Sequence, residues 1–229
     1  MKKFLKKRKK IYKSLLYTRE KLRIIYNTKT RSRFFWNLRK GDSTLSLNYP
    51  LNENSIVFDV GAYKGTFTEK VFNFFNCYVY AFEPLEKYFE LLSNKFLNNE
   101  KVNLYNFGLL DADSTEKLSN IDGASSIYSR DEGELELKVE MKSFNNFVTE
   151  NSFEKIDLLY VNIEGSEYRL LHEIIKSGYI NNIKHLQVQF HNFVDGSKKM
   201  RKEIHSELKK THVCIFNFPF IWERWDLKQ

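Results

Sequence analysis

Short apolar runs alternate with amphipathic stretches from Ile56 onward. The runs 56–60, 78–82 and 102–109 are too short for buried helices and are typical of buried strands. Between them, residues 66–75 and 85–96 carry apolar side chains three and four positions apart, which predicts two helices. This β-α-β-α-β order predicts a parallel sheet with right-handed crossovers.

A polar stretch over residues 111–142 interrupts this alternation. Its last part alternates apolar and polar side chains, with Leu135, Leu137, Val139 and Met141 on one face, as a strand does. We expect an inserted hairpin over one edge of the sheet. Ser143 is expected to cap a short helix.

The alternation then resumes and continues to the C-terminus. The expected strands and helices lie at 156–163, 166–177, 185–190, 197–210, 213–218 and 221–227. The last two are expected to form an antiparallel hairpin around Pro219. The predicted architecture is therefore an α/β, Rossmann-like fold with a seven-stranded, mostly parallel sheet.

Residues 1–40 differ from the rest of the chain in charge. They hold 16 Lys or Arg and a single acidic residue, Glu20, whereas the other residues hold 21 Lys or Arg and 28 acidic residues. The net charge of +8 thus combines a basic N-terminal arm, 1–40, with an acidic domain, 41–229. The arm has no Pro or Gly, and its apolar residues recur at helical spacing, which predicts a basic amphipathic helix.

Three uses of this arm stay open. A basic amphipathic helix suits an anionic membrane surface, where each basic residue is worth about 1 kcal/mol. The arm could instead pack its apolar side on the domain or on another subunit. Aromatic residues among the charges would suit nucleic acid, which we favour least as a partner.

The chain lacks the features of a secreted or membrane-spanning protein. No apolar stretch reaches the roughly 20 residues of a membrane span, and no uninterrupted signal-peptide core follows the basic start. The two cysteines, Cys77 and Cys214, lie in strand-like runs and are expected to be reduced core residues. We therefore expect a cytoplasmic protein that the arm can hold at the inner face of the membrane.

The most informative segment joins the first strand to the first helix, from Phe58 to Phe67. Gly61 and Gly65 let the backbone approach a ligand, and Asp59 places a carboxylate where open α/β sheets bind ligands. Eighteen residues after Gly65, Glu83 follows the second strand. An acid at this offset accepts hydrogen bonds from a ribose diol.

This segment is not the dinucleotide fingerprint G-x-G-x-x-G, because Gly61 is followed by Ala-Tyr-Lys-Gly. A ligand with an amino-acid group in place of a pyrophosphate fits better, and S-adenosylmethionine is such a ligand. A tight strand-helix turn without a ligand is the alternative. The expected cofactor-binding residues are Asp59, Gly61, Ala62, Tyr63, Gly65, Thr66, Glu83, Pro84, Gly108 and Asn162.

Four segments together resemble the FkbM-type methyltransferases. They are IVFDVGAYKGTF (56–67), AFEP (81–84), IDLLYVNIEGSEYRLL (156–171) and LQVQFH (186–191). The resemblance implies a class I methyltransferase fold, S-adenosylmethionine as donor, and methyl transfer, usually to oxygen, on sugars, surface polysaccharides or natural products. Where the family has Lys-Ile-Asp-Val-Glu-Gly, this chain has Tyr160 and Asn162 in place of the Lys and the Asp. The neutral Asn weakens a metal-dependent mechanism, and we assign no metal ligand.

Methyl transfer to a hydroxyl needs a group that removes the proton. Glu164 and His191 each end one of two neighbouring strands, so both are expected at the edge of the sheet that carries the cofactor loop. We predict His191 as the base, with Glu164 orienting it or binding the acceptor. Glu164 could instead cap the following helix, and His191 could be satisfied by the backbone. Glu167 is expected to pair with Arg169 or Lys176 as scaffold.

These observations predict an O-methyltransferase that acts on a sugar hydroxyl of a glycan or glycolipid precursor. A nicotinamide-dependent reductase is disfavoured, because the second glycine of its fingerprint is missing. A non-catalytic binding protein that uses the arm stays open. An RNA methyltransferase would need a Lys-Asp-Lys-Glu set at the sheet edge, and Asn162 stands where its Asp is wanted.

Overall fold

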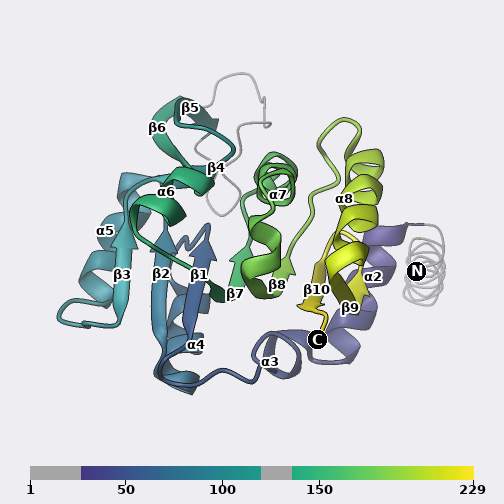
Figure 1. The fold of residues 1–229 in the computed structure, drawn as a ribbon, viewed down its shortest axis with the longest axis horizontal. Helices are drawn as coiled ribbons and strands as arrows, with labels where there is room; N and C mark the ends of the chain where they lie inside the picture. The colour runs from purple at the N-terminus through teal and green to yellow at the C-terminus, as the bar shows by residue number, and fades with distance from the viewer. Residues whose placement is uncertain (1–26, 120–135) are drawn as a thin grey trace, which may run out of the picture.

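A seven-stranded sheet forms the centre of the molecule, shown in Figure 1. The computed structural model describes residues 27–119 and 136–229. The strand order is β3-β2-β1-β7-β8-β10-β9. Strand β10 pairs antiparallel with β8 and with β9, and the other adjacent pairs are parallel. The strands are β1 (Ile56–Val60), β2 (Tyr78–Phe82), β3 (Val102–Tyr105), β7 (Ile156–Val161), β8 (Ile183–Val188), β9 (His212–Phe218) and β10 (Trp222–Leu227). The mostly parallel sheet with a C-terminal antiparallel hairpin is confirmed.

Helices cover both faces of this sheet, because side chains alternate along each central strand. Phe58 of β1 belongs to the core cluster that includes residues of α6, α7 and α8, whereas its neighbour Val57 belongs to a separate cluster with Val71 of α4. Such two-sided burial explains why these strands read as continuous apolar runs. The helices are α4 (Thr66–Phe75), α5 (Glu86–Lys95), α6 (Phe144–Glu150), α7 (Glu167–Lys176), α8 (Ser197–Thr211) and a 3₁₀ turn (Tyr179–Asn182). As expected, Ser143 caps α6 by accepting a hydrogen bond from the backbone of Asn146.

The inserted segment forms a second, three-stranded sheet above the upper ends of β1 and β2 in Figure 1. It consists of β4 (Gly108–Leu110), β5 (Ser114–Ser119) and β6 (Glu136–Ser143), in the order β4-β6-β5. The expected antiparallel hairpin is therefore present as β5 and β6. The expectation of one strand over 102–109 was wrong. The chain leaves the main sheet after Tyr105, and the apolar run continues because β4 is buried in its own right.

The described end of the basic arm packs on the domain. Helix α2 (Thr28–Leu38) and the short α3 (Gly41–Thr44) precede β1. Trp36 of α2 is fully buried among Phe218, Ile221 and Trp222. Packing on the domain therefore holds for this part of the arm. Residues 1–26, with most of its charge, lie outside the described residues, and the boundary expected after residue 40 stays a prediction.

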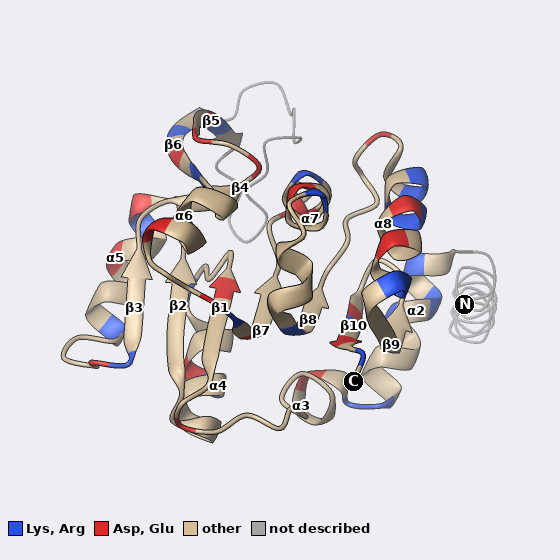
Figure 2. Ribbon diagram, viewed as in Figure 1, with Lys and Arg blue, Asp and Glu red and all other residues tan. Residues whose placement is uncertain are grey.

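Lys and Arg positions are frequent along α2 and α8, which lie in the same part of the molecule (Figure 2). Helix α8 packs beside β9, the strand at that end of the main sheet. Over residues 27–119 and 136–229, no helix is long and apolar enough to cross a membrane.

Candidate functional site

A pocket lies at the carboxyl ends of β1, β2 and β7, where the small sheet supplies one wall. The empty space at this site, including the solvent at its open mouth, is about 750 Å³. The wall from the small sheet is apolar and includes Leu110, Leu118 and Met141. Six of the ten expected cofactor residues line the pocket: Gly61, Tyr63, Glu83, Pro84, Gly108 and Asn162.

The first loop is fixed against its neighbours by Gly61. The N–H groups of Gly61 and Ala62 both donate to the carbonyl of Phe82, at 3.0 Å each. The φ of Gly61 is +90°, and a Cβ at this position would overlap the carbonyl oxygen of Asn162. Only glycine therefore lets the loops after β1 and β7 meet. Tyr63 also has a positive φ of 52°, a conformation that non-glycine residues seldom adopt outside sites held by their surroundings.

Glu83 presents a buried carboxylate to the pocket. Its two oxygens accept hydrogen bonds from the backbone N–H groups of Tyr63 (2.8 Å) and Leu85 (2.9 Å). Burial raises the pKa of Glu83 to about 7, against the lowering effect of these two bonds. Each carboxylate oxygen still has a free lone pair, so the group can accept the two hydroxyls of a ribose.

Two further features of the pocket fit S-adenosylmethionine. The side-chain oxygen of Asn162 is buried and has no hydrogen-bond partner among the described residues, so it can accept a bond from the ammonium group of the ligand. A Cβ at Gly108 would collide with the sulfur of Met141, so this position is flat and bare beside an apolar wall. Such a wall suits an adenine ring. The residues present therefore fit the cofactor.

The other four expected cofactor residues do not line the pocket. Asp59 is 1% exposed and accepts a 2.6 Å hydrogen bond from the hydroxyl of Thr68, and burial raises its pKa to about 6. Ala62 and Gly65 pack against Leu92 of α5. Thr66 is exposed at the start of α4. These four residues therefore do not line the pocket, and their role as cofactor-binding residues stays a prediction; Asp59 Oδ1 is buried and has no hydrogen-bond partner among the described residues.

A second loop, between β7 and α7, brings Glu164 to the pocket. Glu164 has a φ of 46°, and Gly165 follows with a φ of 106°. The N–H of Gly165 donates to the Oε2 of Glu167 at 2.8 Å, and this buried hydrogen bond stabilises the turn. The Glu164 side chain lines the same pocket as Glu83 and Asn162.

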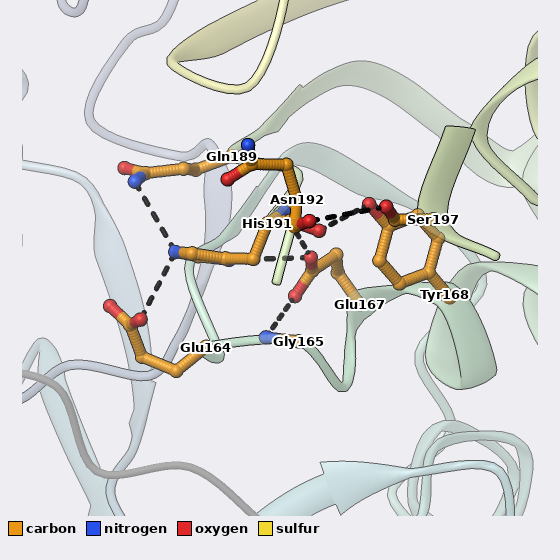
Figure 3. Close-up of polar contacts among 8 residues, drawn as sticks. All are labelled: Glu164, Gly165, Glu167, Tyr168, Gln189, His191, Asn192 and Ser197. Carbon is orange, nitrogen blue, oxygen red and sulfur yellow. Dashed lines mark hydrogen bonds and ion pairs between the residues drawn. The ribbon is translucent and has the colours of Figure 1, made fainter. Parts of the chain in front are cut away.

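The His191 ring lies between the carboxylates of Glu164 and Glu167 (Figure 3). Its Nε2 is 3.2 Å from Glu164 Oε2, and its Nδ1 is 3.3 Å from Glu167 Oε1. Its backbone N–H also donates to Glu167 Oε1, at 2.7 Å, and its carbonyl accepts from the hydroxyl of Tyr168. The side-chain amide of Gln189 also reaches Nε2, at 3.3 Å; a protonated ring can donate only to the oxygen of this amide, which changes places with the nitrogen when the amide group turns over. The ring is thus held in one orientation.

The expected role of His191 as the base does not fit this geometry. Burial alone lowers the pKa of His191, but hydrogen bonds and charge from Glu164 and Glu167 outweigh it and raise the pKa to about 9. At neutral pH the ring is then protonated at both nitrogens and has no lone pair to accept a proton. The residue is also 2% exposed and does not line the pocket.

The partners of Glu167 differ from those that the sequence predicted. It is fully buried and binds Gly165 and His191, not a cation on its own helix. Arg169 instead contacts Asp111 and Glu116, at 2.8 and 3.1 Å. The sequence offered no signal for this role, because a carboxylate in the first turn of a helix is common for dipole reasons alone.

One solved structure shows the same fold, and two others are similar over a comparable share of the chain. A methyltransferase from Streptococcus mutans, crystallised in complex with S-adenosylhomocysteine (SAH), is 14% identical, with a TM-score of 0.50, over 78% of this chain and 91% of that chain. An rRNA methylase from Streptococcus thermophilus is 15% identical, with a TM-score of 0.48, over 78% and 90%. The fibrillarin pre-rRNA processing protein of Methanococcus jannaschii is 15% identical, with a TM-score of 0.47, over 78% and 68%. No curated protein sequence matches this chain.

The family assignment rests on a match to more than half of the chain. Residues 59–214 match the methyltransferase FkbM domain. This range includes the Gly61 loop, Glu83, the Glu164 turn and His191, so the matched region contains the whole pocket edge described above. The chain is therefore a member of the FkbM family of S-adenosylmethionine-dependent methyltransferases.

Proposed function

We propose that this protein transfers the methyl group of S-adenosylmethionine to a hydroxyl oxygen of a sugar, in a glycan or glycolipid precursor. The observation that carries the proposal is the Glu164 carboxylate, which shares one pocket with Glu83 and Asn162. The cofactor supplies an electrophilic methyl group on a sulfonium. The acceptor must then lose a proton beside it.

Glu164 is the proton acceptor in this proposal. A hydroxyl is a weak acid, so a positioned base speeds its reaction by about 10²–10⁴-fold. One oxygen of Glu164 faces the His191 ring at 3.2 Å, which orients the carboxylate that lines the pocket. His191 is a positioning residue, because it acts through Glu164.

Glu167 completes this arrangement from the buried side. It neutralises the His191 ring and binds the N–H of Gly165, so it fixes both the partner of Glu164 and the turn that carries Glu164. A buried imidazolium needs such a counter-charge, because an unpaired charge inside a protein is costly. The cluster therefore holds a carboxylate at the pocket in a defined orientation.

A sugar hydroxyl fits this site better than an amine does. An amine reacts in its neutral form and gains less from a carboxylate base, whereas a hydroxyl needs one near neutral pH. The carboxylate can also accept hydrogen bonds from neighbouring sugar hydroxyls. Methyl transfer to sugars is, in addition, what the family resemblance implies.

The acceptor class can be tested with S-adenosylmethionine carrying an isotope-labelled methyl group. The full-length protein is incubated with nucleotide sugars, a glycolipid extract and total RNA in separate reactions, and the labelled products are identified by mass spectrometry. We expect the label in a sugar methyl ether, which is stable to mild alkali. Label in RNA, in an N-methyl group or in an alkali-labile ester would contradict the proposal.

A further inference from the structure

Helix α2 has an unusual distribution of apolar residues. Its inward face buries only Ser32 and Trp36, four residues apart. Phe34 and Phe35 are each 46% exposed, and Leu38 is 67% exposed. Residues 31, 34, 35 and 38 lie on one side of a helix, so the apolar side chains form a single outward face. Packing against the domain therefore does not explain why these three apolar side chains are present on α2.

Basic residues surround this outward face. Arg31, Arg33 and Arg39 are all exposed, and the sequence from Asn27 to Gly41 contains no acidic residue. Arg31 and Arg39 line a shallow hollow together with Phe35 and with Ile215 of β9, which is itself 51% exposed. The apolar and basic groups thus continue from α2 onto the end strand of the sheet.

We propose that the α2–β9 surface, formed by Arg31, Arg33–Phe35, Leu38, Arg39 and Ile215, docks on an anionic lipid surface. Phe34, Phe35 and Leu38 would enter the boundary between headgroups and acyl chains, and the arginines would face lipid phosphates. A helix with aromatic and leucine side chains on one face and arginines around them has the composition of an interfacial helix. This inference goes beyond methyl transfer and does not depend on the acceptor.

Charge favours lipid over a second copy of the chain. A symmetric dimer through this surface would place the arginines of one copy against those of the other, with no carboxylate between 27 and 41 to pair with them. Anionic headgroups neutralise them instead. Residues 1–26 add 11 Lys or Arg and one acidic residue to the same end of the chain.

The side chains also favour lipid over nucleic acid. Leu38, the most exposed of the three apolar residues, has no ring on which a base could stack. The rings of Phe34 and Phe35 meet edge to face, with centroids 5.4 Å apart, and do not form a flat stacking platform. A lipid boundary needs apolar area alone and accepts this geometry.

The test is sedimentation of the full-length protein with vesicles of phosphatidylcholine, with and without phosphatidylglycerol. We expect binding that requires phosphatidylglycerol and weakens at high salt. The triple variant Phe34→Ser, Phe35→Ser, Leu38→Ser should bind about tenfold more weakly or worse. The matched control is Phe74→Ser with Leu97→Ser, whose side chains are 69% and 73% exposed, on α4 and in the segment between α5 and β3, and it should bind like the wild type.

Thermal unfolding of each variant checks that it is folded. If the triple variant is not, the variant Arg31→Gln, Arg33→Gln, Arg39→Gln takes its place, with the same expected loss. Wild-type vesicle binding by these variants would overturn the proposal. A wild-type protein that does not bind vesicles would also overturn it. In that case, loss of single-stranded RNA binding in the variants would point to nucleic acid, and loss of a dimer in analytical ultracentrifugation would point to a second copy of the chain.

Discussion

His191 is held as a cation between Glu164 and Glu167, with each ring nitrogen about 3.2–3.3 Å from a carboxylate oxygen. Both carboxylates lie on the loop and helix after β7, whereas His191 follows β8, so the ring joins two adjacent strand ends. The charge of the ring is therefore structural. In the proposed reaction, its effect is the orientation of Glu164.

The protonation of His191 can be measured directly by NMR titration of its ring nitrogens. We expect a midpoint near 9, above the ordinary value of 6.5. Because the pKa is raised in the folded protein, the ring stabilises the fold fully below pH 6.5, and this contribution is lost as the pH rises through 9.

The variants Glu164→Gln and Glu167→Gln should each lower the midpoint, because each removes one of the two negative charges that oppose the effect of burial. A wild-type midpoint at or below 6.5 would contradict the positioning role. It would restore a neutral imidazole that could act as the base.

At the residue scale, the sequence predicted the residues that stand directly at strand ends. Gly61, Glu83, Asn162 and Glu164 follow β1, β2 and β7, and all of them line the pocket. The positions of side chains such as His191 and Glu167 depend on contacts between separate strands and helices. Neither spacing nor residue type could show that these two would neutralise each other.

In the loops after β1 and β7, residues with a positive φ determine how closely the ends of these two strands approach each other. Gly61 and Gly178 offer a matched comparison, because both have a positive φ, of 90° and 82°. A Cβ at Gly61 would overlap the backbone of the β7 loop, whereas nothing lies within 4 Å of one at Gly178. The two glycines therefore separate the effect of conformation from the effect of close approach.

The variant Gly178→Ala should lose about 1–2 kcal/mol of unfolding free energy, the cost of a left-handed conformation for alanine, and should bind S-adenosylmethionine normally. The variant Gly61→Ala should lose about 1–3 kcal/mol more, because the added methyl group must displace the β7 loop, and should bind the cofactor poorly. Urea unfolding and titration calorimetry measure both quantities. Equal losses of stability together with equal affinities would show that the loops after β1 and β7 do not need to meet.

The sequence predicted the strands of the main sheet better than it predicted where elements end and which helix faces are buried. Apolar runs located all seven strands of the main sheet, because each central strand is buried on both faces. The run from Val102 was divided wrongly, since burial continues from β3 into β4 although the chain changes sheets. Trp36 was grouped with the basic arm, yet it packs in the core with Trp222, because charge in the sequence does not report which face of a helix is buried.

For the whole molecule, the alternation of strands and helices was enough to predict the sheet, its order of elements and the edge that carries the site. The identity of the methyl acceptor could not be predicted from the sequence in this way. The pocket wall opposite the Gly61 loop comes from the inserted sheet, through Leu118 and Met141, and residues 120–135 of that insertion lie outside the described structure. No general rule links a wall of this kind to a particular sugar.

We propose that Glu164 removes the acceptor proton in the pocket where Glu83 holds the cofactor. The most direct measurement is turnover of the acceptor together with the Kd for S-adenosylmethionine, in the wild type and in single variants. In Glu164→Gln we predict a fall in kcat of about 10²–10⁴-fold with the Kd nearly unchanged. In Glu83→Gln we predict the opposite division, with the Kd raised by an amount equal to about 1–3 kcal/mol. Glu203→Gln, at an exposed position on α8, should match the wild type in both. Turnover by Glu164→Gln within a few-fold of the wild type would contradict the account.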